Sequence, residues 1–551
     1  MKQVVGTSYN IEEELVGRIT FGKKGLFCRS NDILVYSGGC DKPAFGYLAV
    51  VADRTPLHIN EKPYCVVDNI DDFNEGDVVV INKRGEIVFV YEINSRHNAL
   101  MATERCNHRC IMCPQPPVLQ ENDKTPFNLK LISLFDKATQ EIGITGGEPT
   151  LIGDNLFTLI NHIKKELPRT AISILSNGVK FADKEYAMKL SMCRHQDLQI
   201  DIPLFSDIAE VHNSIVGAKT FYKTVQGLYN LALFRQRIGI RIVVHKQTYK
   251  RLPQFADFIY HNFPFVAQVA FMQMETIGLA KENIDSLWID PYDYNTELKE
   301  AVLLLWDRGI PAYIYNAQLC VLPEEVRQFA AQSISDWKDI YLDECEGCVL
   351  KGKCAGFFES NRKYHSKHIK PQKTYTPQPK PLSDDISPFV KICISQLDLL
   401  NNSVVYDIPC GYGRHSMWLS KMGHEVHCID IDDNAINCLI KRNSCECDNS
   451  MAISRQDIMS IEEVAVCDLL INVHLYSPDF INIFTRLLKP QGYLIIETPD
   501  NRGGNYTELP EPGTIKSLIK DDYDIIEYYE SAPVDGRVSV KVFARKKTPF
   551  V

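Results

Sequence analysis

Strand-like and helix-like segments alternate between residues 98 and 310, and this alternation constrains the fold more than any other feature. The predicted strands are 98–103, 141–145, 171–176, 198–205, 240–245 and 266–274. Stretches of helical periodicity lie between them, at 128–140, 153–166, 183–192, 220–238, 253–262 and 293–309. Alternation of this kind predicts a parallel sheet with right-handed crossovers. Six units are too few for an eight-fold barrel, so we expect a partial (β/α)6 barrel.

Different patterns flank this region. Residues 1–97 contain short apolar runs broken by turn signals, which predicts a small β-rich domain, a barrel or a sandwich. Residues 311–360 carry four cysteines, and residues 361–383 hold six Lys/Arg, four Pro and no acid, which is typical of a linker. A basic strip that binds nucleic acid or an acidic partner is the alternative. Residues 384–551 alternate again, as in a doubly wound, Rossmann-like domain. The prediction is an α/β multidomain chain.

Composition narrows the class of protein. The chain has 551 residues and a net charge of −10, which argues against a nucleic-acid-binding protein. It shows neither a signal peptide nor an apolar run long enough to span a membrane, so we expect a cytoplasmic protein. Eighteen cysteines in a reducing compartment are expected to be metal ligands or buried thiols rather than disulfides.

The stretch C-N-H-R-C-I-M-C places Cys106, Cys110 and Cys113 on a loop after the first predicted barrel strand. A closed zinc site and a [4Fe–4S] cluster both take four protein ligands. Three cysteines would therefore leave one iron of a cluster open to a non-protein ligand. The alternative is a zinc site completed by a distant ligand such as His108.

Glycine-rich and polar segments end the next two predicted strands. T-G-G-E-P-T contains Gly146 and Gly147 beside Glu148, and S-N-G contains Ser176 and Asn177. The carboxyl ends of parallel strands meet at one edge of a sheet. We therefore expect these residues to lie close to the three cysteines.

The pair C-N-H-R-C-I-M-C and G-G-E-P resembles the radical S-adenosylmethionine (SAM) enzymes over about residues 98–280. The resemblance implies a [4Fe–4S] cluster on the three cysteines, with SAM chelating the open iron. It also implies a flavodoxin- or ferredoxin-type electron donor and cleavage of SAM to a 5′-deoxyadenosyl radical. By position, Gly146, Gly147 and Glu148 would hold the methionine amino group, while Ser176 and Asn177 would face the ribose or carboxylate. No catalytic residue is assigned.

A second cysteine group offers four thiols, a complete ligand set for one cluster. It consists of Cys320, Cys345, Cys348 and Cys354. The spacing resembles the auxiliary-cluster segment of peptide-modifying radical SAM enzymes, in a shortened version with Phe358 where a further cysteine often stands. A zinc ribbon is the alternative, since four cysteines also satisfy tetrahedral zinc.

The C-terminal region contains a strand followed by a glycine-rich turn, D-I-P-C-G-Y-G. This pattern resembles class I SAM-dependent methyltransferases, and it implies a second SAM site. Its residues would be Asp407, Gly411, Gly413, Asp430 at the ribose hydroxyls and Asp457 at the adenine. A methyltransferase fold without activity is the alternative.

Residues 1–360 resemble the maturases of His-Xaa-Ser peptide systems, through A-L-M-A-T-E-R-C-N-H-R-C-I-M-C-P-Q-P-P with L-C, S-I-S-D-W-K and C-E-G-C. The resemblance implies a ribosomally made peptide as substrate and partner. The N-terminal domain would then either dock a leader segment by strand addition at a sheet edge or only cap the barrel. The alternatives are an RNA- or small-molecule-modifying radical enzyme and a non-enzymatic iron–sulfur scaffold.

Overall fold

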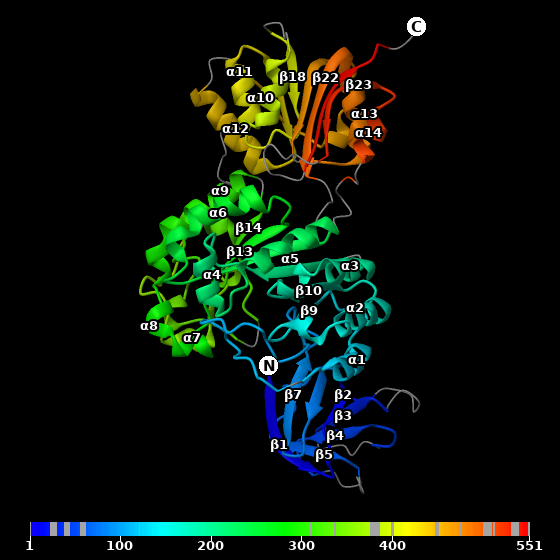
Figure 1. The fold of residues 1–551 in the computed structure, drawn as a ribbon, viewed down its shortest axis with the longest axis vertical. Coiled ribbons are helices and arrows are strands. Elements are labelled where there is room, and N and C mark those ends of the chain that lie inside the picture. Colours follow the sequence, from blue (N-terminus) through cyan, green and yellow to red (C-terminus); the bar gives the residue numbers. More distant parts are fainter. Residues whose placement is uncertain are drawn as a thin grey trace.

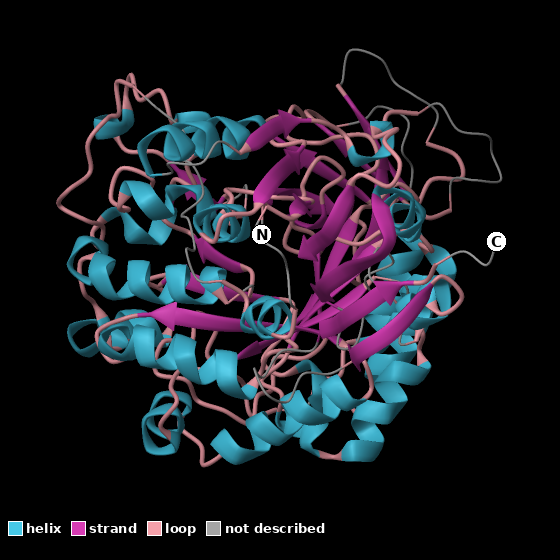
Figure 2. Ribbon diagram, turned by 90° about the horizontal axis from the view of Figure 1, so that it is seen from above, coloured by secondary structure: helices cyan, strands magenta, loops and turns pink. Residues whose placement is uncertain are grey.

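A computed structural model describes most of the 551 residues. It leaves out residues 1, 23–29, 38–43, 56–61, 121, 196, 309, 336–337, 375–385, 398–401, 447–450, 474, 500–509, 511–512, 531–538 and 549–551. The N-terminal strands, the middle α/β region and the C-terminal sheet follow one another along the long axis of the molecule (Figure 1). Viewed along that axis, helices surround a central group of strands (Figure 2). The predicted mixed α/β architecture is confirmed.

Seven strands near the N-terminus form a closed barrel in the order β1-β5-β4-β3-β2-β6-β7. They are β1 (Gln3–Tyr9), β2 (Leu15–Thr20), β3 (Asp32–Tyr36), β4 (Ala49–Ala52), β5 (Tyr64–Val67), β6 (Val78–Ile81) and β7 (Glu86–Tyr91). Pairing of β1 with both β5 and β7 completes the closure. A closed barrel has no free sheet edge, so the expected docking of a peptide by strand addition is not available to these strands.

The barrel shares a hydrophobic core with the middle region. Val78, Val80 and Tyr91 belong to the same buried cluster as the residues beneath the large sheet. The Tyr91 ring stacks on Phe135 with centroids 4.4 Å apart, and its hydroxyl lies 2.9 Å from the Thr139 hydroxyl. The N-terminal barrel is therefore packed against the α/β region.

The middle region contains an eight-stranded, entirely parallel sheet in the order β15-β14-β13-β12-β11-β10-β9-β8. Its strands are β8 (Ala99–Met101), β9 (Glu141–Thr145), β10 (Ala171–Leu175), β11 (Leu198–Pro203), β12 (Arg237–Val244), β13 (Gln268–Gln273), β14 (Ala312–Tyr315) and β15 (Ala330–Ala331). All six predicted strands are present. The short strands β14 and β15, which the sequence patterns did not predict, extend the sheet.

Helices cover one face of this sheet. The helices of this region are α1 (Thr125–Leu134), α2 (Asn155–Glu166), α3 (Lys184–Met192), α4 (Ala209–Val216), α5 (Phe221–Leu233), α6 (Leu252–Asn262), α7 (Leu279–Glu282), α8 (Ile284–Leu287) and α9 (Asn295–Asp307). Of these, α4, α7 and α8 contribute to a separate buried cluster that includes Met112 of the cysteine loop. Alternate strand residues, such as Ile172, Ile200 and Ile240, are buried in the core on this side. The residues between them point to the opposite, inner face, which is less buried and more polar.

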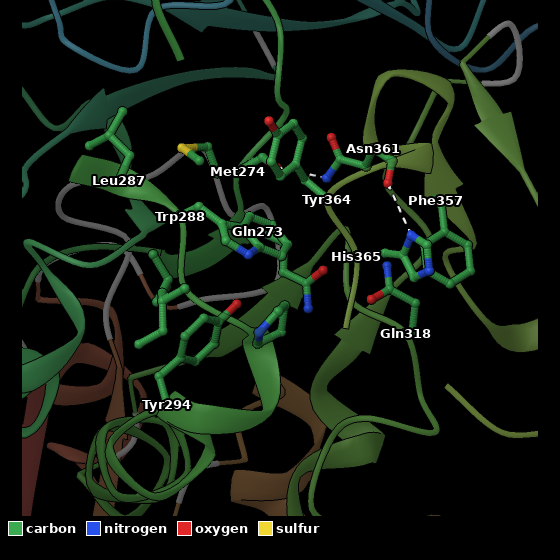
Figure 3. Close-up of a pocket in the computed structure, with 13 residues that line it drawn as sticks. Gln273, Met274, Leu287, Trp288, Tyr294, Gln318, Phe357, Asn361, Tyr364 and His365 are labelled. Carbon is green, nitrogen blue, oxygen red and sulfur yellow. Dashed lines mark hydrogen bonds between the residues drawn. The ribbon is translucent and has the colours of Figure 1, made fainter. Parts of the chain in front are cut away.

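The segment after the sheet is mostly irregular and contains a short antiparallel strand pair, β16 (Asp339–Ile340) and β17 (Phe357–Phe358). Residues that follow β17 pack back onto the sheet. Asn361 donates from Nδ2 to the carbonyl of Met274, and its Oδ1 accepts from the backbone of Thr276 at 2.9 Å. Figure 3 shows Asn361 and His365 in the pocket where this segment meets Gln273 at the end of β13.

The predicted linker of residues 361–383 is therefore wrong for its first part. Lys367 donates its backbone N–H to Asp290, and Val349 donates to the carbonyl of Gln372. Local composition could not reveal these contacts, because their partners lie far away in the sequence. Residues 375–383 of the predicted linker lie outside the described residues.

The C-terminal sheet has the order β20-β19-β18-β21-β22-β24-β23. Its elements are α10 (Pro388–Ser395), β18 (Val404–Asp407), α11 (Arg414–Lys421), β19 (Glu425–Asp430), α12 (Asp433–Glu446), β20 (Ala452–Arg455), β21 (Cys467–Val473), α13 (Pro478–Leu487), β22 (Leu488–Pro499), α14 (Thr514–Ile519), β23 (Tyr523–Tyr529) and β24 (Ser539–Lys546). β24 is antiparallel to both neighbours. The strand order reverses at β18, which is where doubly wound sheets bind ligands.

Among the described residues, no helix has the length and apolar character needed to cross a membrane.

Candidate cluster and SAM sites

The loop that carries Cys106, Cys110 and Cys113 is fastened to helix α4. The backbone N–H of Arg109 donates to Val216 at 2.9 Å, and that of Ile111 donates to Ile215 at 3.0 Å. Gly217 ends α4 with φ +65°, and a Cβ there would lie 2.8 Å from the Arg109 carbonyl oxygen. The loop therefore has a fixed position beside the carboxyl ends of the first strands.

The three thiols lie near one another. Burial, together with the smaller effect of the neighbouring thiols of Cys106 and Cys113, raises the pKa of Cys110 to about 12. Burial also raises the pKa of Cys106 to about 11. A bound metal centre would reverse this, since ligating thiols are deprotonated. The donor set fits a cluster that takes three protein ligands.

The His108 side chain contacts the start of helix α5. Its Nε2 lies 2.9 Å from the Thr220 hydroxyl, its side chain is buried, and burial lowers its pKa to about 4. The imidazole therefore packs the cysteine loop against the start of α5 in its neutral form. The alternative zinc site completed by His108 gains no support.

The glycines of the T-G-G-E turn are required by a close approach of two backbone segments. A Cβ on Gly146 would lie 2.3 Å from the Thr103 carbonyl oxygen, and one on Gly147 would lie 2.2 Å from that of Arg105. The N–H groups of Gly147 and Glu148 donate to the same two carbonyls at 2.8 and 2.7 Å. No hydrogen bond within the described chain uses the carbonyl oxygens of Gly146 or Gly147, so both can accept one from a ligand.

The Glu148 side chain points into the protein. It is 1% exposed, and its two oxygens accept hydrogen bonds from Thr150, the Ser176 hydroxyl and the Asn177 backbone. Burial raises the pKa of this carboxyl group. The contact of Glu148 with the methionine amino group stays a prediction. Glu148 ties the end of β9 to the end of β10.

Ser176 and Asn177 complete the same network. The Ser176 hydroxyl donates to Glu148 at 2.8 Å, and the Asn177 amide donates to the Asn107 side chain at 2.6 Å. Asn107 belongs to the cysteine loop. The structure thus brings together the three predicted segments, with the two side chains engaged in holding them to one another.

The second cysteine group surrounds one pocket. Its lining includes all four predicted thiols, those of Cys320, Cys345, Cys348 and Cys354. Lys370 and Gln372, from the segment predicted as linker, complete the wall. Residues far apart in the chain therefore enclose a space bordered by four sulfur atoms.

Backbone N–H groups point at these sulfurs. Gln372 donates to the Cys348 sulfur at 3.3 Å, and Leu319 donates to that of Cys354 at 3.5 Å. Lys370 provides a third such donor, which lowers the pKa of Cys320 against the larger, raising effect of burial. Hydrogen bonds of this kind stabilise metal-bound thiolates. Sequence reasoning missed these donors because a backbone N–H carries no residue signature.

Across the part of the chain that the structure describes, no three His, Cys, Asp or Glu side chains converge closely enough to hold a single metal ion.

The predicted second SAM site lies at the carboxyl edge of the C-terminal sheet. Asp407 is buried at the end of β18, where Ser416 donates to one carboxylate oxygen. The other oxygen, Oδ1, has no hydrogen-bond partner among the described residues. Burial raises the pKa of Asp407 to about 7. An unpartnered buried carboxylate oxygen fits the ammonium group of a bound SAM.

The other residues predicted for the second SAM site lie at or near the same edge of the sheet as Asp407. The two oxygens of Asp430 accept from Gly411 N–H at 2.8 Å and Asp432 N–H at 2.9 Å. Gly411 and Gly413 have φ of +51° and +82°, and a Cβ on Gly411 would meet nothing within 4 Å. Asp457 is exposed and accepts from the Met459 N–H at 2.9 Å. Asp407, Gly411, Gly413 and Asp430 therefore share one edge, and Asp457 follows the neighbouring strand β20.

Two family profiles match the chain. That of the radical SAM superfamily covers residues 100–259, and that of the tellurite resistance protein TehB covers residues 385–493. The chain therefore contains a radical SAM domain and a C-terminal TehB-like domain with a SAM methyltransferase fold. Together these two domains indicate an enzyme.

Individual relatives cover only parts of the chain. GTP 3′,8-cyclase from Desulforamulus reducens is 24% identical over 197 residues, which are 34% of this chain and 58% of that protein. The tungsten-containing aldehyde ferredoxin oxidoreductase cofactor-modifying protein from Pyrococcus furiosus is 28% identical over 177 residues, which are 29% and 47% of the two chains. The chain thus spans about half the length of these relatives.

Among solved structures, TehB from Haemophilus influenzae is 21% identical, with a TM-score of 0.24, and the match covers 28% of this chain and 62% of that one. Magnesium protoporphyrin IX methyltransferase from Synechocystis is 18% identical, also with a TM-score of 0.24, over 29% and 76%.

Proposed function

We propose that the protein cleaves SAM reductively at the Cys106, Cys110 and Cys113 site and uses the resulting 5′-deoxyadenosyl radical to modify a substrate carbon. The main support is the convergence of the cysteine loop, the Gly146–Gly147 turn and Asn177 at one sheet edge within the radical SAM match. The radical SAM family implies a [4Fe–4S] cluster, SAM and an electron donor, for which we propose a flavodoxin or ferredoxin type.

Each part of this edge has a separate role in the proposal. The three thiols would hold the cluster, and the free carbonyls of Gly146 and Gly147 would accept the methionine ammonium group. Glu148, Ser176 and Asn177 would act as positioning residues, since their side chains fasten the glycine turn and the cysteine loop to β10. Their packing would also keep water from the site.

We further propose that the second pocket holds an auxiliary [4Fe–4S] cluster. A cluster takes one cysteine for each of its four irons, which suits four cysteines that line one pocket. The N–H donors from Leu319, Lys370 and Gln372 support a site for anionic sulfur.

At the C-terminal edge we propose a second SAM site that serves methyl transfer. The unpartnered Asp407 Oδ1 would receive the ammonium group, and Asp430 would bind the ribose hydroxyls through its remaining lone pairs. Asp457 would lie near the adenine.

For the substrate we propose a ribosomally made peptide, as in the His-Xaa-Ser maturases that residues 1–360 resemble. The second cysteine pocket supports this choice through its resemblance to peptide-modifying enzymes. A nucleotide is the second candidate, because a relative of the radical SAM domain is a GTP 3′,8-cyclase.

The deciding experiment is a SAM cleavage assay on anaerobically reconstituted, reduced protein. Wild-type protein should release 5′-deoxyadenosine, and the Cys106→Ala, Cys110→Ala, Cys113→Ala protein should not. Equal release from both proteins would refute the proposal. A mass gain of about 14 Da on a substrate peptide, which is the net change when a methyl group replaces a hydrogen atom, would add evidence for methyl transfer.

A further inference from the structure

We propose that the inner face of the radical SAM sheet binds an anionic group of the substrate through Arg241, with Asp201 and Tyr315 beside it. This inference rests on the proposed function, because it names a substrate chemistry for the same domain. None of the motifs found in the sequence includes Arg241 or Tyr315.

Arg241 lies on β12 with its side chain on the inner face. Its neighbours Ile240 and Ile242 are fully buried on the helix side, so alternation places Arg241 on the other. Its Nε donates to the Met272 sulfur at 3.3 Å. No acidic side chain within the described chain forms an ion pair with it, which leaves most of its guanidinium N–H donors available.

Arg237 provides a direct contrast. It lies four residues earlier on the same strand and the same face, but its guanidinium pairs with Asp197 at 3.1 Å. The two arginines are about 13 Å apart along the strand. The protein therefore neutralises the arginine near the amino end of β12 and leaves the one nearer the carboxyl end for another partner.

Asp201 lies on the neighbouring strand β11, and several contacts fix its side chain on the same face as Arg241. It is 6% exposed and accepts hydrogen bonds from Gln199 at 2.8 Å and Ser173 at 3.1 Å. Its partner across the strands is Gly239, where a Cβ would lie 2.1 Å from Asp201 Oδ1. The carboxylate thus lies over Gly239, two residues before Arg241 on the same face.

Tyr315 on β14 brings a hydroxyl to the same space. β13 separates it from β12, and Met272, the sulfur partner of Arg241, pairs with Tyr315 across the strands. Burial raises the pKa of Tyr315, the charge of Asp201 raises it further, and Arg241 opposes both. Three strands therefore present a cation, a carboxylate and a phenol to one region of the inner face.

Arg241, Asp201 and Tyr315 together favour a ligand with an anionic group. A half-buried guanidinium without an acidic partner favours a carboxylate or a phosphate, which it can bind through two parallel hydrogen bonds. Tyr315 can donate to the same oxyanion, and Asp201 can accept from an N–H or O–H group next to it. Arg241 lies three residues before the end of β12, so the anion would bind about 10 Å below the cysteine rim. The substrate would then extend from this anchor toward the rim.

The test uses phenylglyoxal labelling of arginines in the full-length protein, read by peptide mass spectrometry. Inorganic phosphate, a glutamate-containing peptide with an amidated C-terminus and GTP are the anionic probes, and acetamide, the matching amidated glutamine peptide and guanosine are the controls without that anion. We expect at least one anion to slow labelling of Arg241 several-fold and every control to leave it unchanged. Labelling of Arg237 should not respond. Protection by the peptide alone identifies a carboxylate, and protection by GTP and phosphate identifies a phosphoryl group.

Two outcomes overturn the proposal. Equal labelling of Arg241 with every probe would show that it binds no anion, and full protection by SAM alone would assign the anion to the carboxylate of SAM itself. As a second measurement, calorimetry should show that Arg241→Gln loses binding of the protecting anion while Arg237→Gln retains it. These readouts do not require SAM cleavage, so failure of the proposed reaction and failure of the anion site remain distinguishable.

Discussion

The backbone N–H of Gln372 donates a hydrogen bond to the sulfur of Cys348 over 3.3 Å, although the two residues are 24 positions apart. Gln372 lies within residues 361–383, the segment that the sequence predicted to be a linker. The path toward the C-terminal domain therefore leaves directly from the second cysteine pocket.

Gln372→Pro should lower the reduction potential of a cluster in that pocket, because proline removes the N–H that stabilises charge on the Cys348 sulfur. Gln372→Ala keeps the N–H and serves as the matched control. Redox titration followed by electron paramagnetic resonance measures both. Equal potentials in the two variants would show that this hydrogen bond has no influence.

The Cys106→Ala, Cys110→Ala, Cys113→Ala protein should keep iron and sulfide after reconstitution, since the four thiols of the second pocket remain. Metal analysis gives the answer directly. Further replacement of Cys345 and Cys348 by alanine should remove this iron. Zinc without iron in the first variant would establish a zinc ribbon instead.

Gly147→Ala should destabilise the protein by about 1–3 kcal/mol, since the added Cβ would overlap the Arg105 carbonyl oxygen. The displaced turn should also reduce 5′-deoxyadenosine release by roughly tenfold or more. Gly352→Ala is the control, because a Cβ there meets nothing within 4 Å. In urea unfolding and in the cleavage assay, Gly352→Ala should have the same stability and the same 5′-deoxyadenosine release as the wild-type protein. Equal stability and release in Gly147→Ala and Gly352→Ala would contradict the prediction.

SAM binding at the C-terminal site should tighten as pH rises from 6 to 8. Burial raises the pKa of folded Asp407 from 3.8 to about 7, so below pH 7 the folded protein must release a proton before it can pair with an ammonium group. The affinity should gain up to roughly tenfold per pH unit below this pKa. Calorimetry on protein without the first three cysteines isolates this site.

The raised pKa of Asp407 also makes the free energy of unfolding depend on pH. Between pH 3.8 and about 7 the folded state keeps a proton that the unfolded chain has lost, so Asp407 favours folding at low pH. That contribution is lost as pH rises through 7. Asp407→Asn should remove both pH dependences and weaken SAM binding. A pH-dependent affinity that persists in Asp407→Asn would assign the titration to another group.

The sequence predicted the regular elements well, because period and apolar runs determine strands such as β10 and β12. It also predicted which segments meet at the cysteine rim, since parallel strands share their carboxyl edge. It could not predict that the Glu148 carboxylate would accept hydrogen bonds from Ser176 and Asn177, because those partners depend on side-chain direction. For the same reason the sequence could not predict that Arg241 lies on the inner face of the sheet or that Gln372 contacts Cys348.

The stacking of Tyr91 on Phe135 joins the N-terminal barrel to the radical SAM domain through one continuous core. Removal of the barrel would expose this apolar surface to water, and a truncated chain that begins at residue 98 would be prone to aggregation. The two regions are accordingly expected to melt in a single cooperative transition, so that thermal unfolding of residues 1–374 should register as one event and not two.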